Sequence, residues 1–152
     1  MARLGPRDPA VTSRMMSRVR SKDTKPEIAL RRALHTAGMR YRLHPGDVPG
    51  KPDLAVKSVR LAVFVDGDLW HGNPAEPARR GRTSLADLFP TRTDWWVAKI
   101  DRNRSRDEQV NATLTAAGWT VLRLWESDVL TDPAAAAARV LECRDRLRAA
   151  CP

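Results

Sequence analysis

The chain has 152 residues, of which 42% are hydrophobic, enough for one domain with a real core and too few for two. This composition excludes a disordered chain, and no apolar run reaches the roughly 18 residues that a membrane helix needs. The only cysteines, Cys143 and Cys151, lie near the C-terminus, which excludes a disulfide framework and a four-cysteine zinc site.

The charge balance is strongly basic. Lys and Arg number 27 against 18 Asp and Glu, which gives a formal net charge of +9. A charge this large on a small domain indicates a polyanionic partner, most commonly nucleic acid. We expect residues 1–13 to form a flexible basic arm and residues 14–152 to form one domain. The arm lacks the apolar centre of a secretory signal, so a cytoplasmic location is predicted. We also expect the protein to be a monomer, to associate with the nucleoid and to make no membrane contact.

A first helix is predicted over residues 25–37. Thr24 followed by Glu27 forms a capping-box pattern at its start, and Gly38 suits its end. Further along the chain, Pro and Gly mark a loop over residues 44–52.

Two β-rich runs follow, over residues 53–56 and 61–66, joined by a short polar turn. They predict an antiparallel hairpin. The second run is almost wholly apolar, which is typical of a central strand covered on both faces.

The remaining segments predict a long surface loop over 72–92, a helix over 94–117, a strand over 120–129 and a final helix over 133–150. The resulting order is helix, two or three strands, helix, strand, helix. This order predicts an α/β protein with a mixed sheet in a single compact domain.

Two acidic residues stand at corresponding ends of the predicted hairpin. Asp53 opens one strand and Asp66 closes the next, so the two carboxylates should meet at one end of the sheet. They would repel each other unless a divalent cation lies between them, and Mg²⁺ prefers carboxylates together with phosphate oxygens. The alternative is that both are ordinary turn residues, which the spacing alone slightly favours.

Histidine and polar helix residues add to this pattern. His71 lies five residues beyond Asp66 and could give or take a proton, although a lone histidine is more often structural. Asn103 and Asp107 interrupt the apolar face of the second helix, so each should bond to a specific partner, structural or functional. Asn103 is also counted among the candidate DNA contacts.

Basic and aromatic side chains supply candidate DNA contacts. The second helix carries basic residues suited to phosphates or to a solvated face: Lys99, Arg102, Arg104 and Arg106. Trp70, Trp95 and Trp96 either insert between base steps or pack in the core. The N-terminal segment offers a second wedge among basic residues, comprising Met15, Met16, Arg18, Arg20 and Lys22.

Five blocks of the sequence resemble the very-short-patch-repair (Vsr) endonucleases of the PD-(D/E)XK superfamily. They are MMSRVRSKDTKPEIALRRAL, PGKPDLAV, AVFVDGDLWHG, PTRTDWWVAKIDRNRSRD and GWTVLRLWE, in order over residues 13–128. The resemblance implies a restriction-endonuclease-like mixed sheet flanked by helices. It also implies Mg²⁺-dependent nicking of one strand of double-stranded DNA at T·G mismatches, with Mn²⁺ as a substitute ion. Other repair or modification-system proteins are further candidate partners.

The resemblance also implies roles for individual residues. Asp53 is similar to the central metal-binding aspartate, and Val65 to a position that offers its backbone carbonyl to the metal. Asp66 stands where well-known members carry histidine and other relatives Asp. His71 is similar to the catalytic histidine, and Glu27 to the acid of the first helix. Trp70 and Trp96 are similar to two aromatics that enter the DNA stack, and Met16 to a wedge from the opposite groove.

The sequence departs from the family at three points. The aromatic set has Leu69 in place of a phenylalanine. Cysteine and histidine ligands of a structural zinc are replaced by Asp68, Asn73 and Ser127, so no structural zinc is expected. The superfamily lysine is replaced by Asp68, so proton transfer falls to His71. Two alternatives remain, a nicking nuclease of a restriction or phage-defence system and a catalytically inactive DNA-binding module.

Overall fold

The computed structural model describes residues 23–150, and its centre is a four-stranded sheet in the order β1-β2-β3-β4. The first three strands are antiparallel, and β3 and β4 are parallel. The strands are β1 (Arg42–Leu43), β2 (Leu54–Val56), β3 (Leu61–Asp66) and β4 (Thr120–Trp125). The predicted hairpin is therefore confirmed as β2 and β3, and β1 is the optional third strand of the prediction.

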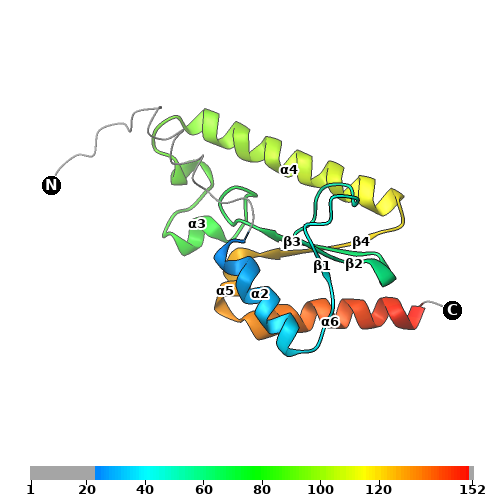
Figure 1. Ribbon diagram of the computed structural model, residues 1–152. Helices are drawn as coiled ribbons and strands as arrows, with labels where there is room; N and C mark the ends of the chain where they lie inside the picture. The colour runs from blue at the N-terminus through cyan, green and yellow to red at the C-terminus, as the bar shows by residue number, and fades with distance from the viewer. Residues whose placement is uncertain (1–22, 151–152) are drawn as a thin grey trace.

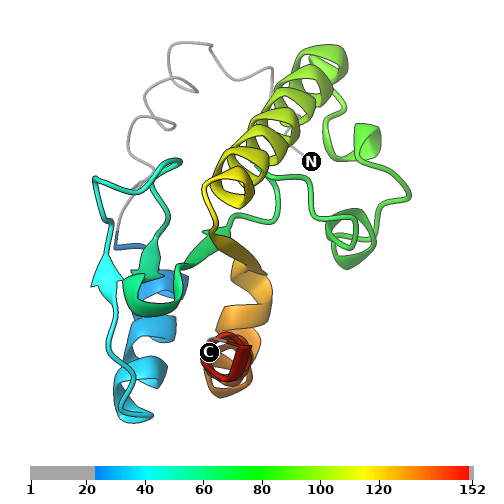
Figure 2. The same ribbon diagram turned by 90° about the vertical axis from the view of Figure 1, so that its right-hand side faces the viewer.

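Helices cover both faces of the sheet (Figures 1 and 2). One face carries α2 (Lys25–Thr36), α5 (Glu126–Thr131) and α6 (Pro133–Ala150), and the long helix α4 (Thr93–Ala116) crosses the other face. The remaining short elements are η1 (Lys57–Val59), α3 (Glu76–Arg79) and η2 (Ala86–Leu88). The mixed α/β class and the three main helices agree with the sequence prediction. No helix within 23–150 is long and apolar enough to cross a membrane.

Strand β3 divides the core into two clusters because its side chains alternate between the faces. Val63 packs with Leu30 and Leu34 of α2 in the larger cluster. Ala62 and Phe64 face α4 in the smaller one. β3 is thus buried on both sides, as its apolar run predicts, and its last residue reaches the α4 side of the sheet.

Two predicted boundaries are wrong. The segment 72–92 is not a loop throughout, because it contains α3 and η2. The strand predicted over 120–129 ends at Trp125, the last residue paired with β3, and Glu126 and Asp128 then lie in the first turn of α5. Acidic side chains favour a helix N-terminus, so the polar residues after Trp125 start a helix rather than extend the strand.

The ends of the helices follow the predicted signals. The Thr24 hydroxyl accepts from the Glu27 amide at 3.5 Å, and the Glu27 carboxylate accepts from the Asp23 amide at 2.9 Å. At α6, Asp132 Oδ1 accepts from the Ala135 amide at 3.0 Å. The predicted arm and the candidate DNA contacts Met16, Arg18, Arg20 and Lys22 lie outside the described residues and stay predictions.

Candidate active site

A cavity of about 400 Å³ opens where the ends of β2 and β3 meet α4 and the start of α2. All five sequence-predicted catalytic and metal-binding residues line it. They are Glu27, Asp53, Val65, Asp66 and His71. The structure therefore brings these five residues to one place from four separate segments, and Asp107, Arg106, Lys51 and Arg123 complete the walls.

Asp53 is a carboxylate with few donors. Its Oδ2 accepts one hydrogen bond, from the Val65 amide at 2.6 Å, and no basic side chain among residues 23–150 pairs with it. Burial, together with the nearby carboxylates of Glu27 and Asp66, raises the pKa of Asp53 to about 7 against the opposing effect of the Val65 amide. A cation would relieve this concentration of negative charge.

Glu27 is held from the other side by basic groups. Its Oε2 accepts from Arg31 Nη2 at 3.2 Å and lies 3.6 Å from His44 Nε2. Arg31 also pairs with Asp23 at 2.8 Å. Glu27 is 5% exposed, so this network fixes a buried acid beside Asp53.

Asp66 ends β3 on the α4 side and is paired with an arginine of the neighbouring strand. Arg123 Nη1 lies 2.9 Å and 3.1 Å from its two oxygens. Burial raises the pKa of Asp66 although His71 and Arg123 oppose the shift. Asp66 is therefore a partly compensated acid, in contrast to Asp53.

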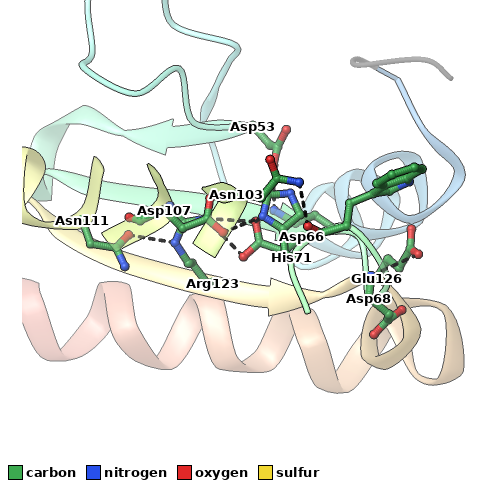
Figure 3. Close-up of polar contacts among 11 residues, drawn as sticks. Asp53, Asp66, Asp68, His71, Asn103, Asp107, Asn111, Arg123 and Glu126 are labelled. Carbon is green, nitrogen blue, oxygen red and sulfur yellow. Dashed lines mark hydrogen bonds and ion pairs between the residues drawn. The ribbon is translucent and has the colours of Figure 1, made fainter. Parts of the chain in front are cut away.

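His71 and Asp107 form a close pair across the cavity (Figure 3). His71 Nδ1 lies 2.6 Å from Asp107 Oδ2 and 3.9 Å from Asp66 Oδ1. Because a carboxylate only accepts, Nδ1 carries the proton in this pair and the lone pair of the neutral ring is on Nε2. Ligand atoms of Asp66, His71 and Asp107 all lie within 4.8 Å of one another. Asp107 is thus a component of the site, a role that its polar position on an apolar helix face left open.

The predicted aromatic residues form one cluster beside the cavity. Trp96 contacts Trp70 at 5.6 Å and Trp95 at 4.8 Å between ring centroids, and Phe89 stacks on it at 5.0 Å. Trp95 is 38% exposed, and the cations of Arg92 and Lys99 lie over its ring. Of the three tryptophans, Trp95 presents the most accessible ring, and Trp96 fills the centre of the cluster.

Asn103 and Arg104 hold the loop that carries His71. Asn103 Nδ2 donates to the Trp70 carbonyl at 2.9 Å, and Arg104 Nη2 donates to the Gly72 carbonyl. Gly72 has a φ of +66° with Arg104 against it, so a side chain there would be strained and would meet the guanidinium. The specific partner expected for Asn103 is therefore a backbone carbonyl of the site.

A further buried acid, Asp68, lies in this loop but outside the cavity lining. Its Oδ1 accepts from Asn73 Nδ2 and from Ser127 Oγ, both at 2.7 Å, and its Oδ2 accepts from the Ser127 amide at 3.1 Å. Arg79 Nη1 lies 3.5 Å away. Asp68, Asn73 and Ser127, here called the Asp68 clasp, thus tie the loop after β3 to the start of α5. They are the three positions where the family resemblance leads one to expect zinc ligands.

Two basic residues of the cavity, Lys51 and Arg123, were not predicted from the sequence. Arg123 stands within the apolar strand run TVLRLW, and a charged residue in such a run is the signal that could have identified it. Lys51 has a φ of +49° in the loop before β2, and no sequence pattern placed its side chain at the cavity.

Together, the mixed sheet and the cavity define a class of protein. A cluster of acids of which one, Asp53, is short of donors, a carboxylate-bound imidazole and a basic chain are the features of a phosphodiester-cleaving nuclease with a restriction-endonuclease-like core.

Comparison with known proteins supports this class and gives the family. A sequence model described as DNA mismatch endonuclease Vsr matches residues 6–76. The type II nicking enzyme V.NmeDIP of Neisseria meningitidis serogroup C is 40% identical over 91% of this chain and 89% of its own length. V.NaeI of Lentzea aerocolonigenes, also a type II nicking enzyme, is 44% identical over 85% and 75%. DNA mismatch endonuclease Vsr of Escherichia coli is 32% identical over 78% and 71%. The chain belongs to the Vsr family of DNA endonucleases.

Proposed function

We propose that this protein is a Mg²⁺-dependent endonuclease that nicks one strand of double-stranded DNA at T·G mismatches. The observation that carries the proposal is the cavity itself, in which Asp53 has no basic partner among residues 23–150 and His71 is oriented by Asp107. The names of the relatives, a mismatch endonuclease and several nicking enzymes, support the choice of substrate and of a single-strand cut.

The donor set fits a hard divalent cation. Asp53, Asp66 and the Val65 carbonyl would hold Mg²⁺, since carboxylate and carbonyl oxygens are its preferred protein ligands. The raised pKa of Asp53 has the same physical origin, because a buried carboxylate beside other acids favours either a proton or a cation. When bound, Mg²⁺ neutralises the scissile phosphate and acidifies a water.

His71 moves the proton in this proposal. With Nδ1 bonded to Asp107, Nε2 is the nitrogen that takes a proton from the attacking water or gives one to the leaving oxygen. The Asp107 carboxylate stabilises the imidazolium that forms. Asn103 and Arg104 hold the backbone on either side of His71 and so limit the movement of the ring.

Basic and aromatic side chains position the DNA. Lys51 and Arg106 line the cavity, and neither side chain has a hydrogen bond or ion pair within the described range 23–150. Both are thus available for phosphate oxygens. Trp95, with Lys99 and Arg92 over its ring, offers an exposed aromatic face for a base step, which supports the predicted role of the tryptophan cluster.

A second candidate function keeps the chemistry and changes the substrate. Several relatives are named type II nicking enzymes without mention of a mismatch. We therefore also consider nicking of modified or unmodified DNA in a restriction or defence system.

A substrate panel separates these functions. Duplexes with a T·G mismatch, with methylated cytosine and with ordinary pairs are incubated with Mg²⁺ and read on a denaturing gel with each strand labelled separately. We expect one cut strand, in the mismatched duplex alone. Equal cutting of the plain duplex would favour the second candidate, and binding without any cut would support an inactive DNA-binding module.

The role of His71 is tested on the same panel. His71→Ala should lower kcat about 10²–10⁴-fold, the usual contribution of a positioned acid or base. His35→Ala is the matched control, because His35 is an exposed histidine of α2 that does not line this cavity. A fully active His71→Ala variant would remove proton transfer from the proposed role of this residue.

A further inference from the structure

Arg123 occupies an unusual place in the sheet. It stands in the middle of β4, directly paired with Phe64 of the parallel strand β3. Its face of the sheet is the one covered by α4, where the neighbours Ala62, Phe64 and Val121 are apolar. The Arg123 side chain is 19% exposed, and an arginine so buried is costly unless every part of the guanidinium is engaged.

The guanidinium of Arg123 is engaged on all sides (Figure 3). Nη1 donates to both oxygens of Asp66, at 2.9 Å and 3.1 Å. Nε donates to Asn111 Oδ1 at 2.8 Å, and Nη2 donates to the Asp107 carbonyl at 3.5 Å. Its central carbon, Cζ, lies over the Phe64 ring, 4.1 Å from the ring centroid. Lysine could supply the charge, but not this planar set of separate donors.

These contacts join the two halves of the cavity. Asp66 belongs to the metal-binding half, and Asp107 belongs to the proton-transfer half through its bond to His71. Arg123 Nη1 also lies 3.6 Å from Asp107 Oδ1, so one nitrogen contacts an acid of each half. Asp107 and Asn111 stand one turn apart on α4, so the same side chain fixes this part of the helix against the sheet.

We propose that Arg123 is a positioning residue of the nuclease, which holds the Asp66 carboxylate and the Asp107–His71 pair in a fixed relation. The inference rests on the proposed function in one respect, that Asp66 is a metal ligand. A positioning role and a simple electrostatic effect predict opposite changes in metal affinity when Arg123 is removed. As a charge alone, Arg123 would repel a cation, and its removal would tighten metal binding. As a positioning group, its removal leaves Asp66 without a fixed orientation and weakens metal binding.

The test measures metal binding and turnover separately. Mn²⁺ binding without DNA is followed by electron paramagnetic resonance for the wild type, Arg123→Met and Arg123→Lys. We expect Arg123→Met to raise the Kd for Mn²⁺ and to lower kcat, each by about 10–100-fold, with the KM for DNA within about threefold of wild type. Arg123→Lys should recover part of both losses. Where Arg123→Met does not fold, as judged by circular dichroism, Arg123→Lys alone is compared with the wild type, and losses of at least fivefold are expected.

Arg60→Met is the matched control. Arg60 Nη1 donates to the Ala117 carbonyl at 3.3 Å, so this arginine also ties the sheet region to the end of α4, but away from the cavity. It should leave kcat and the Kd for Mn²⁺ unchanged. The proposal is overturned if Arg123→Met binds Mn²⁺ as tightly as the wild type or more tightly, if only KM changes, or if Arg60→Met has the same effect. A wild type that takes up no Mn²⁺ is a different result, because it overturns the proposed function itself.

Discussion

Asp53 and Asp68 are both acids near the end of β3, yet their surroundings shift the pKa of the carboxyl group in opposite directions. Asp68 receives hydrogen bonds from Asn73 and Ser127, and these donors lower its pKa even though burial acts to raise it. Asp53 receives one hydrogen bond, and burial raises its pKa to about 7. In Figure 3 the two acids lie on different sides of the Asp66–His71 segment.

The difference shows that donor supply, rather than burial, distinguishes a structural carboxylate from one available to a cation. Asp68 is 5% exposed and Asp53 is only partly buried, so the side chain with less exposed surface is the one whose pKa is lowered. The negative charge of Asp68 is compensated by hydrogen-bond donors of the protein itself, Asn73 and Ser127. The charges of Asp53 and its neighbours exceed what the cavity compensates, because Arg123 serves Asp66 while Asp53 has no basic partner in the described part of the chain.

The largest effect is expected from Asp53→Asn. The change keeps the shape and an oxygen for the Val65 amide, but it removes the charge that would hold Mg²⁺. We expect nicking to fall at least about 10³-fold, a loss of about 4 kcal/mol or more of transition-state stabilisation. DNA binding should persist or tighten, because one repulsive charge is lost. Single-turnover cleavage and a binding titration measure the two effects, and full activity of the variant would refute the metal assignment.

The next effect is one of stability and concerns the Asp68 clasp. Asp68→Ala leaves the buried Asn73 amide and the Ser127 hydroxyl without their acceptor, so we expect the free energy of unfolding at pH 7 to fall by about 2–4 kcal/mol. Asp101→Ala, at an exposed site on α4, is the control and should change it by less than about 0.5 kcal/mol. Because the pKa of Asp68 is lowered in the folded state, its contribution is present above pH 4 and is lost as the pH falls below that value. Urea unfolding at pH 7 and at pH 3 checks both statements.

The fold and part of the site followed from local sequence patterns. The Thr24 and Glu27 capping signal, the apolar run of β3 and the acids at the two strand ends are local features, and each led to the observed element or position. The clasp and Arg123 depend on which segments meet across the parallel pair β3 and β4, a contact between residues about 57 apart in the chain. A local sequence pattern does not predict a contact between segments this far apart in the chain. The sequence therefore identified the acids but not the partners that distinguish them.

The pH dependence of stability carries the opposite sign for Asp53. Between pH 4 and 7 the folded protein binds a proton at Asp53 that the unfolded chain, with the ordinary pKa of 3.8, has released. The free energy of unfolding therefore falls as the pH rises through this range. We expect a fall of about 1–3 kcal/mol for the wild type relative to Asp53→Asn, because a raised pKa of a few units corresponds to at most about 4 kcal/mol. Urea unfolding of both proteins from pH 4.5 to 8 measures the difference, and parallel curves would contradict it.

The last prediction, whose size depends on the metal concentration, separates the two acids by their response to metal. Mg²⁺ at 100 times its Kd should stabilise the wild type by about 2.7 kcal/mol, and at ten times its Kd by about 1.4 kcal/mol, because the ion binds the folded state alone. The same addition should leave the Tm of Asp53→Asn unchanged. In Asp68→Asn the Mg²⁺-dependent rise in Tm should persist from a lower starting value, since the clasp and the cavity are separate charge systems. A metal chelator added to the wild type should leave the Tm as it is, because the hydrogen bonds of Asp68, Asn73 and Ser127 fix the loop without an ion. A large fall in Tm with the chelator would instead place a structural metal in this region. It would contradict the conclusion that Asp68 is stabilised by hydrogen bonds alone while Asp53 binds a cation.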